Sequence, residues 1–356
     1  MSLSAAGLII AALMSGSNIF TDVARKKAVQ KHSLIPATFW CQVLAAVIFG
    51  IVLVARIAAG GGVVFRDGGD LFGIAGLHLL PAATYFIYLS IDVLLVSIAN
   101  ILYFRALQVS PLSLCIPFLP FTPIFVIPTG FVMLRELPPA AKLLGVVLVF
   151  VGSALMHRRL FAVSWLAPVK AIVQERGSRY MLTVAFIFSI TNPLEKKLVL
   201  MTDVYTQAFA FGIGLCVFFF VLTLARRENF QAALRGNIVW VSAAGAMDEI
   251  SLLLQFASYH YIDVVISISI KPAGIVLAVF FGWLFFRERG IPDKVIASSV
   301  MLVGVLIIYL PVNRWQGLKI TALALVGAAI ALHFTRGQAL VPAGGERLVR
   351  TRGEER

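Results

Sequence analysis

Long apolar runs separated by short polar or charged segments dominate the chain. A helix needs about 20 apolar residues to cross a hydrocarbon layer about 30 Å thick. At that scale the pattern predicts ten core transmembrane helices, over residues 3–23, 36–56, 83–106, 111–134, 140–156, 181–200, 205–224, 238–258, 264–286 and 294–311. No segment alternates with the two-residue period of a membrane-barrel strand. The predicted fold class is an all-α polytopic membrane protein.

The C-terminal region adds an eleventh apolar stretch, residues 318–334, which is short for a span. It fits either an extra transmembrane helix or an interfacial helix. Residues 336–356 are rich in charge and poor in apolar side chains, so we expect them to be disordered. Residues 58–70 contain GGG and DGGD and predict a flexible loop.

Composition agrees with the pattern. Hydrophobic residues make up 60% of the chain, charged residues 13%, and the mean hydropathy is +0.94. Soluble domains contain about 45–50% apolar and about 25% charged residues, so a water-soluble fold is excluded. The net charge is +13, but Lys and Arg lie in short groups between apolar runs. That distribution is typical of orientation signals and headgroup contacts, so the expected partner is the lipid bilayer, with no nucleic acid.

The chain ends and cysteines add two expectations. No cleavable signal peptide is apparent near the N-terminus, so we expect the first apolar segment to be retained in a multi-pass protein of the inner (cytoplasmic) membrane. Cys41, Cys115 and Cys216 lie inside apolar runs without a CxxC motif or a histidine at ligand spacing. We interpret them as apolar fillers and expect neither a metal nor a cofactor.

An internal repeat is the most informative feature. Residues 21–29 (TDVARKKAV) match residues 191–199 (TNPLEKKLV) without a gap, 170 positions further on. Residues 134–136 (LRE) match 286–288 (FRE) at an offset of 152, as do Pro120 with Pro272 and Gly152 with Gly304. The two offsets differ by about the length of an extra Gly-rich loop in the first half.

The repeat predicts four regions: a first repeat over 1–157, a linker over 158–179, a second repeat over 180–311, and a C-terminal apolar segment with its tail over 312–356. Each repeat has five helices. Because five is odd, the second repeat enters the membrane from the opposite side, and the repeats are predicted to be inverted. Inverted repeats build a site near the midplane that opens alternately to either face.

The chain resembles the ten-helix, EamA-like family of the drug/metabolite transporter superfamily over about residues 3–311. YFRALQVSPLSLCIPFLPFTPIF and LRELPPAAKLLGVVLVFVGSAL carry the resemblance in the first half, and SISIKPAGIVLAVFFGWLFFRERGIPDKVIASSVMLVGVLII carries it in the second. A Pro-containing helix, a Glu at a short loop and a Gly-bearing final helix occur twice. The resemblance implies a carrier for amino acids, other metabolites or amphipathic drugs, and it does not choose among them.

Polar side chains inside the apolar segments are the candidates for a binding site. An ionisable group at the bilayer centre costs at least about 2.5–3.5 kcal/mol, so each requires a function or a partner. Several share helix faces at helical spacing. The predicted substrate-binding residues are Asn18, Asp22, Tyr88, Asp92, Asn100, Tyr103, Asn192, Asp248, Gln255, Tyr259 and Lys271.

Some of these residues have simpler interpretations. Asp22, like Lys196 in the second repeat, lies where a helix end could meet headgroups. Tyr88 could belong to an aromatic belt at the interface, and Asp92 could point to a neighbouring helix. These alternatives stay open at the level of sequence.

Lys271 directly precedes a helix-breaking proline. We predict that it pairs with Asp248 or Glu249 in one state, so that exchange of that partner for substrate or a proton couples binding to motion; a permanent interhelical salt bridge is the alternative. Pro120 and Pro272 are the predicted hinges, against static kinks tolerated by packing.

Small residues and loop glutamates are interpreted structurally. Gly145, Gly152 and Gly304 predict close packing between the fifth and tenth helices. Glu136 and Glu288, each next to an arginine, predict helix-end charge pairs or gate contacts.

The distribution of Lys and Arg and the family resemblance predict opposite orientations of the chain in the membrane. Together with the adjoining helix ends, the loops joining helices 1–2, 3–4, 5–6, 7–8 and 9–10 carry 16 Lys and Arg residues, and the other loops, through Lys319, carry 8. This count favours an external N-terminus, whereas the resemblance implies an internal one. We expect a monomer or a homodimer.

Three function classes compete. The favoured one is a secondary transporter that exports a small metabolite, an amino acid or an amphipathic compound by alternating access around a central cavity; no P-loop indicates direct use of ATP. The alternative is a flippase for a lipid-linked or amphipathic phosphate-bearing molecule, for which Lys271 and Arg105 supply basic groups. An intramembrane enzyme is disfavoured because HExxH and GxSxG motifs are absent from the sequence.

Overall fold

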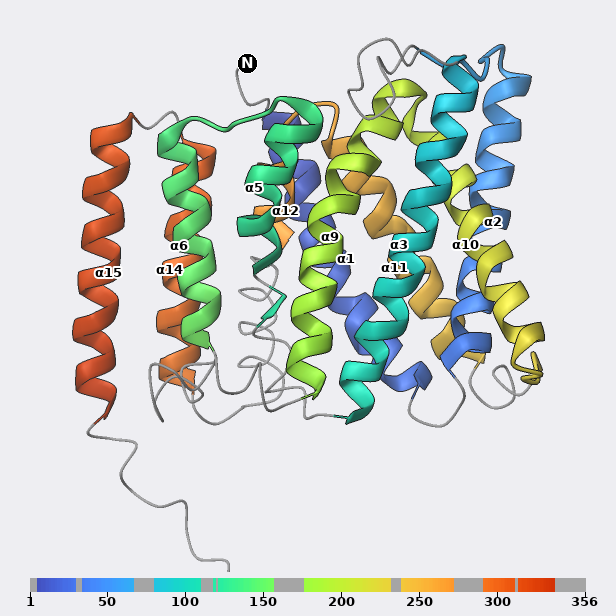
Figure 1. Ribbon diagram of the computed structural model, residues 1–356. Coiled ribbons are helices and arrows are strands. Elements are labelled where there is room, and N and C mark those ends of the chain that lie inside the picture. Colours follow the sequence, from blue (N-terminus) through green and yellow to red (C-terminus); the bar gives the residue numbers. More distant parts are fainter. Residues whose placement is uncertain are drawn as a thin grey trace, which may run out of the picture.

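A computed structural model shows a bundle of roughly parallel and antiparallel helices (Figure 1). It describes residues 5–29, 34–66, 80–109, 118–119, 121–156, 176–231, 238–271, 291–310 and 313–336. Within these ranges there are eleven helices and no β-strand. In chain order the helices are α1 (Ala5–Val29), α2 (Leu34–Ala58), α3 (Pro81–Val109), α5 (Phe121–Leu134), α6 (Ala140–Met156), α9 (Arg176–Met201), α10 (Val204–Ala225), α11 (Ile238–Ser258), α12 (Val264–Ile270), α14 (Ile291–Tyr309) and α15 (Arg314–Arg336).

The all-helical prediction is confirmed, and most predicted ends lie within a few residues of the observed ones. Two segments differ. The helix predicted from residue 111 is described only from Phe121, as α5, and the helix predicted over 264–286 is described only to Ile270, as α12. The remaining parts of both lie outside the described residues, as does most of the C-terminal tail. Residues 59–66 form neither helix nor strand, as expected for a loop.

By length and apolar composition, four helical stretches among the described residues could cross a membrane: Ile35–Ala58, Pro81–Ala106, Val204–Ala225 and Ile238–Ser258. The apolar stretches of α1, α5, α6, α14 and α15 are shorter. Large apolar side chains face outward on many helices, including Val54 on α2 at 66% exposed and Leu323 on α15 at 73%. An outer surface of this kind fits lipid rather than water.

Helix α9 is less apolar because its second half carries Asn192, Glu195, Lys196 and Lys197. The first three of these side chains are buried inside the bundle. These polar side chains of α9 therefore lie in the protein interior, where each charged group requires a partner.

The helices pack in a pattern that is preserved when the two halves of the chain are exchanged. Helix α1 packs on α11 and α9 packs on α3, while α2 pairs with α10 and α6 with α14. Helices α1 and α9 run in opposite directions, since α1 starts at the end of the bundle marked N and α9 finishes there (Figure 1). Helix α15, the predicted extra C-terminal helix, packs along α14 and α6.

The glycines of α6 and α14 allow their backbones to touch, as the sequence predicts. A Cβ added to Gly145 would lie 2.7 Å from the carbonyl oxygen of Gly304, and one on Gly152 would lie 3.0 Å from that of Ala297. Under the 152-residue offset, Gly145 corresponds to Ala297 and Gly304 to Gly152. The two contacts are therefore images of one another.

A second pair of corresponding contacts joins α2 and α10. The rings of Phe39 and Phe220 lie 5.7 Å apart between centroids. A Cβ on Gly50 would lie 3.2 Å from the ring of Phe209. With the 170-residue offset, Phe39 corresponds to Phe209 and Gly50 to Phe220.

We expect Gly304→Ala to destabilise the bundle by about 1–3 kcal/mol, the usual cost of overpacking. The new methyl would meet the backbone oxygen of Gly145 and the backbone nitrogen of Val149, both at 2.8 Å, and neither can move alone. The matched control is Gly327→Ala on α15, where nothing lies within 4 Å of the added atom. The thermal midpoint of the purified protein in detergent measures both. Equal midpoints for the two variants would contradict the close-packing interpretation.

Candidate functional site

A buried network of polar side chains joins α9 to α11. The Gln255 Nε2 atom lies 2.8 Å from Glu195 Oε2, 3.2 Å from Asn192 Oδ1 and 2.8 Å from the Tyr259 hydroxyl. That hydroxyl in turn lies 3.3 Å from Asn192 Oδ1 and 3.4 Å from Glu195 Oε2. All four side chains are buried. In a low-dielectric interior such a network holds its members in one arrangement.

Lys271 completes this arrangement from the end of α12. Its ammonium donates to Gln255 Oε1 at 3.0 Å, and its positive charge acts on Glu195. We call Asn192, Glu195, Gln255, Tyr259 and Lys271 the Gln255 network. The side-chain amide of Gln255 thus donates to a carboxylate at one end and accepts from an ammonium at the other.

Helix α1 holds the Lys271 backbone in place. The Ser15 hydroxyl lies 3.0 Å from the carbonyl oxygen of Ile270 and 2.8 Å from that of Lys271. Lys271 is seven residues beyond Val264, where α12 begins, so it lies about 10 Å along that helix at 1.5 Å per residue. The first half of the chain therefore contacts the network at depth in the bundle.

The local sequence of α9 explains why the side-chain oxygen of Asn192 is directed to α11. Pro193 lies inside the helix and has no N–H to donate to the carbonyl of Ser189. Thr129 on α5 supplies a hydroxyl to that carbonyl instead. The Asn192 amide donates to its own helix at Phe188, which leaves its oxygen directed to α11. The backbone carbonyl left without a donor by Pro193 thus has a hydrogen-bond partner inside the protein, which lipid could not supply.

Glu195 belongs to the network but was not among the predicted site residues. Its position three residues after Asn192 places both on the same helix face, which is the signal that could have identified it. The repeat alignment pairs it with Arg25 near a helix end. Lys196, four residues after Asn192, shares that spacing equally well, because the spacing alone does not define how α9 is rotated.

Several predicted site residues lie elsewhere or outside what is described. Asn18 donates to the carbonyl of Met14 in its own helix at 2.9 Å. The hydroxyl of Tyr88 accepts from Lys197 Nζ at 3.1 Å, and that ammonium also lies 4.6 Å from the ring centre. Tyr88 is 1% exposed, so the belt interpretation is wrong for this side chain. The Asp22 side chain, Pro120 and Pro272 lie outside the described residues.

The other predicted site residues of α3 lie at separate positions along the helix. Asp92 is fully buried, and neither carboxylate oxygen has a hydrogen-bond partner among the described residues. Asn100 and Tyr103 are half-buried further along, where the Tyr103 ring packs edge-on against Phe104. Asp248 is half-buried on α11. Its pairing with Lys271 stays a prediction.

An ion pair links α5 to α9 near the end of the bundle that carries the N-terminus. Lys196 Nζ lies 2.5 Å from Glu136 Oε1 and 2.8 Å from the carbonyl oxygen of Ile262. The other Glu136 oxygen accepts from the backbone N–H of Val264 at 3.1 Å, at the positive end of α12. Lys196 is buried, which corrects its alternative interpretation as a headgroup contact. Glu136 forms the expected helix-end charge pair, with a lysine.

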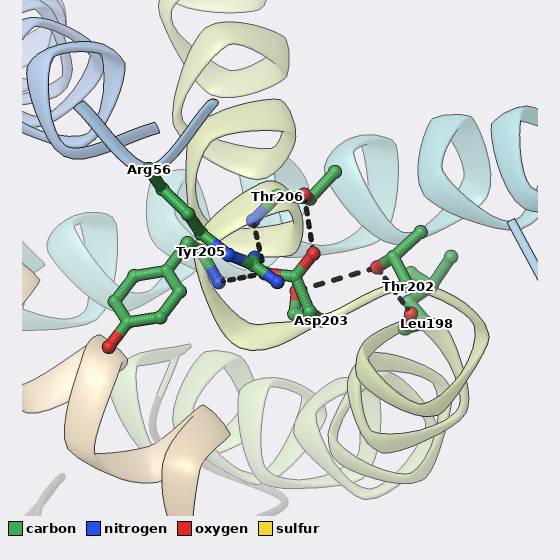
Figure 2. A network of polar contacts seen from close by, with 6 residues as sticks. All are labelled: Arg56, Leu198, Thr202, Asp203, Tyr205 and Thr206. Carbon is green, nitrogen blue, oxygen red and sulfur yellow. Dashed lines mark hydrogen bonds and ion pairs between the residues drawn. The ribbon is translucent and has the colours of Figure 1, made fainter. Parts of the chain in front are cut away.

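A second ionic contact joins α2 to α10 at the same end of the bundle (Figure 1, Figure 2). Arg56 pairs with Asp203, which caps α10. The Asp203 carboxylate accepts from the backbone N–H of Tyr205 at 3.0 Å and from the Thr206 hydroxyl at 2.7 Å. The Arg56 guanidinium lies 5.4 Å from the Tyr205 ring centre.

The surroundings of Asp203 set its charge. Partial burial opposes ionisation, but the hydroxyl and N–H of Thr206, the Arg56 charge and the N–H of Tyr205 together hold its pKa below the usual value. A carboxylate that accepts several N–H and O–H groups at a helix N-terminus is favoured in its charged form.

We expect Asp203→Ala to cost about 0.5–2 kcal/mol of stability at neutral pH, because the helix cap is lost. Since the folded-state pKa of Asp203 is lowered, its ionic stabilisation is complete above the ordinary value of about 3.9 and is lost as pH falls through the lower folded value. The difference in thermal midpoint between the wild type and Asp203→Asn should therefore shrink on acidification. A difference that stays constant from neutral pH to pH about 3 would contradict this assignment.

Among the described residues, no group of three or more His, Cys, Asp or Glu side chains could hold a metal ion. The candidate site is therefore built from hydrogen-bonding groups and two opposite charges. Such groups are able to form hydrogen bonds and charge contacts with a polar solute.

Comparison with known proteins places this geometry in a family. Residues 176–310 match the EamA-like transporter family. No curated protein matches the chain. A solved structure titled only "Crystal structure of protein" aligns with a TM-score of 0.64 at 16% identity, over 87% of this chain and 100% of that one. At that identity the likeness concerns the fold alone.

The matched residues contain five of the described helices in full, and the Gln255 network lies entirely within them. The family consists of transporters and not of enzymes, which agrees with the function class favoured by the sequence. Residues 176–310 thus form an EamA-like transporter domain, and this family implies a multi-pass membrane transporter.

Proposed function

We propose that the protein is a secondary transporter that exports a small metabolite, an amino acid or an amphipathic compound across the inner membrane by alternating access around the Gln255 network. The observation that carries the proposal is this network itself: the buried Glu195 carboxylate and the half-buried Lys271 ammonium are joined through the buried Gln255 amide where α9, α11 and α12 meet. Charged groups at such depth are costly and mark solute pathways in membrane proteins.

Inverted five-helix repeats, residues 1–157 and 180–311, are part of the proposal. The opposite directions of α1 and α9 and the exchangeable helix contacts support it. The paired contacts at Gly145 and Gly152 support it at the level of single residues. The matched family region, residues 176–310, nearly coincides with the second proposed repeat. Rocking of one repeat against the other then exposes the site to each face in turn.

In this proposal, the two ionic contacts hold the bundle closed at one end. Arg56 and Glu136 belong to the first proposed repeat, and their partners Asp203 and Lys196 belong to the second. Both pairs lie at the end of the bundle that carries the N-terminus (Figure 1). Opening at that end therefore requires both pairs to separate. Pro120 and Pro272 stay the proposed hinges.

The polarity of the network favours a zwitterionic solute within the proposed classes. Gln255 presents a donor to Glu195 and an acceptor to Lys271. An amino acid carries the same pair in stronger form, with an ammonium for Glu195 and a carboxylate for Lys271. Charge-assisted hydrogen bonds are roughly twice as strong as neutral ones, so such a solute can displace the amide.

The test is a flux screen with purified protein in liposomes. Neutral amino acids, organic cations and fluorescent phospholipid analogues are each offered, with protein-free liposomes as the control. We expect saturable flux of at least one amino acid and no flipping of the phospholipid analogues. Flipping of a lipid analogue without flux of any soluble compound would replace the carrier with the flippase.

A further inference from the structure

Asp92 is a buried carboxyl group without the hydrogen bonds that surround Glu195. It lies on α3 eleven residues after Pro81, which is about 16 Å along the helix. Its side chain is 0% exposed, and both of its oxygens lack a hydrogen-bond partner among the described residues. Buried polar groups are nearly always paired, so each exception calls for an explanation.

A negative charge at this position would be very costly. Removing a carboxylate from water costs several kcal/mol even after the protein relaxes, and only a cation or several donors offset that cost. The surrounding side chains on α3 are apolar and buried, among them Leu89, Val93 and Val96. This conformation therefore holds Asp92 as the neutral carboxylic acid.

The titratable groups on the neighbouring helices do not neutralise Asp92. Those in the matching part of α9 are Glu195, Lys196 and Lys197, and those of α10 are Tyr205 and Cys216. Helix α11 carries Asp248 and Glu249 and is followed by Tyr259. Helix α3 itself carries Tyr85, Tyr88, Tyr103 and the exposed Arg105. Lys196 pairs with Glu136, and Lys197 contacts Tyr88.

The charge that acts on Asp92 is that of Glu195, a like charge. Glu195 accepts hydrogen bonds from Gln255 and Tyr259, and the positive charge of Lys271 acts on it, so its ionised form has partners that Asp92 lacks. One lysine compensates only one carboxylate. Two carboxylates that share a site cannot both be charged at low cost, so the pair retains one proton.

We propose that Asp92 is the proton-binding site of this transporter and that its protonation couples a pH gradient to solute movement. The inference rests on the proposed function and adds its driving ion. In each cycle the carboxylate accepts one proton from water at one face, and the O–H bond breaks when the site opens to the other face, where water takes the proton. A proton requires no space, which suits a fully enclosed side chain better than a metal or a metabolite does.

Infrared spectroscopy tests the protonated state without any solute. The spectrum of the wild type minus that of Asp92→Asn at neutral pH should contain the carbonyl stretch of a protonated carboxylic acid, shifted in heavy water. The band should persist in the matched control Asp263→Asn, since Asp263 precedes α12 without capping it through its side chain. A difference spectrum without this band would overturn the inference.

Transport measures the coupling. With the amino acid identified in the liposome screen, we expect Asp92→Asn to lose the acceleration by a pH gradient that the wild type shows. Asp92→Glu retains a carboxyl group and should restore part of that acceleration.

The possible failures can be told apart. Wild-type exchange that ignores a pH gradient overturns the proton site and leaves the proposed function standing. Absence of flux with every probe overturns the proposed function, and the infrared band then decides the protonation of Asp92 alone.

Discussion

Glu195→Gln should abolish amino-acid flux in liposomes, including exchange at equal pH. The substitution preserves shape and removes the negative charge that compensates Lys271 inside the Gln255 network. Hydrogen bonds to charged groups contribute about 1.5–3 kcal/mol, and 1.4 kcal/mol corresponds to a tenfold change, so we expect a loss of at least about tenfold. The measurement is the initial rate of exchange of the transported amino acid.

Glu228→Gln is the matched control for this prediction. Glu228 follows α10, at the end of the bundle opposite the N-terminus, and lies outside the network. It should leave exchange at the wild-type rate. Asp92→Asn is a further comparison, because that variant should lose the response to a pH gradient. Wild-type exchange in Glu195→Gln would remove the network from the solute pathway.

Lys196→Met should cause a large loss of stability, greater than that of Asp203→Ala. The Lys196 side chain is 6% exposed and pairs with Glu136, so its removal leaves a half-buried carboxylate with only the N–H of Val264. Breaking a buried pair from one side costs about 3–5 kcal/mol, and we expect about 3 because Glu136 keeps one donor and some access to water. Thermal unfolding in detergent measures the loss.

The double variant Lys196→Met/Glu136→Gln should recover part of that stability, because no carboxylate is then left uncompensated. Lys197→Met is the neighbouring control. Lys197 lies over the Tyr88 ring, a contact that contributes about 0.5–2 kcal/mol. If the Lys197 substitution were as costly as that of Lys196, the ion pair would not be the dominant interaction at this end of α9.

The positions of the helices were predictable from sequence because apolar run length is set by the bilayer. The ranges 140–156 and 238–258 agree with α6 and α11 at both ends. The close approach at Gly145 and Gly304 was predictable for a similar reason, since small residues at recurrent spacing permit contact between helices in lipid.

The partners of the buried charges were harder to predict. Glu136 was expected to form a charge pair, but its partner Lys196 is 60 residues away and on another helix. Spacing does not separate Glu195 from Lys196 as the neighbour of Asn192, because the two differ by only about 100° around α9. A repeat alignment shows which residues of the two halves correspond, but it does not show how each helix is rotated about its own axis.

By itself, the sequence determined that this protein is an all-helical membrane protein with polar groups inside its apolar segments, because hydrophobic length and residue spacing are local properties. The tertiary structure alone decided that Gln255 lies between Glu195 and Lys271 and that Asp92 is left without a partner among the described residues. Those relationships depend on how helices from distant parts of the chain rotate and slide against each other until buried polar groups are satisfied. That is a property of the packed bundle and not of any segment within it.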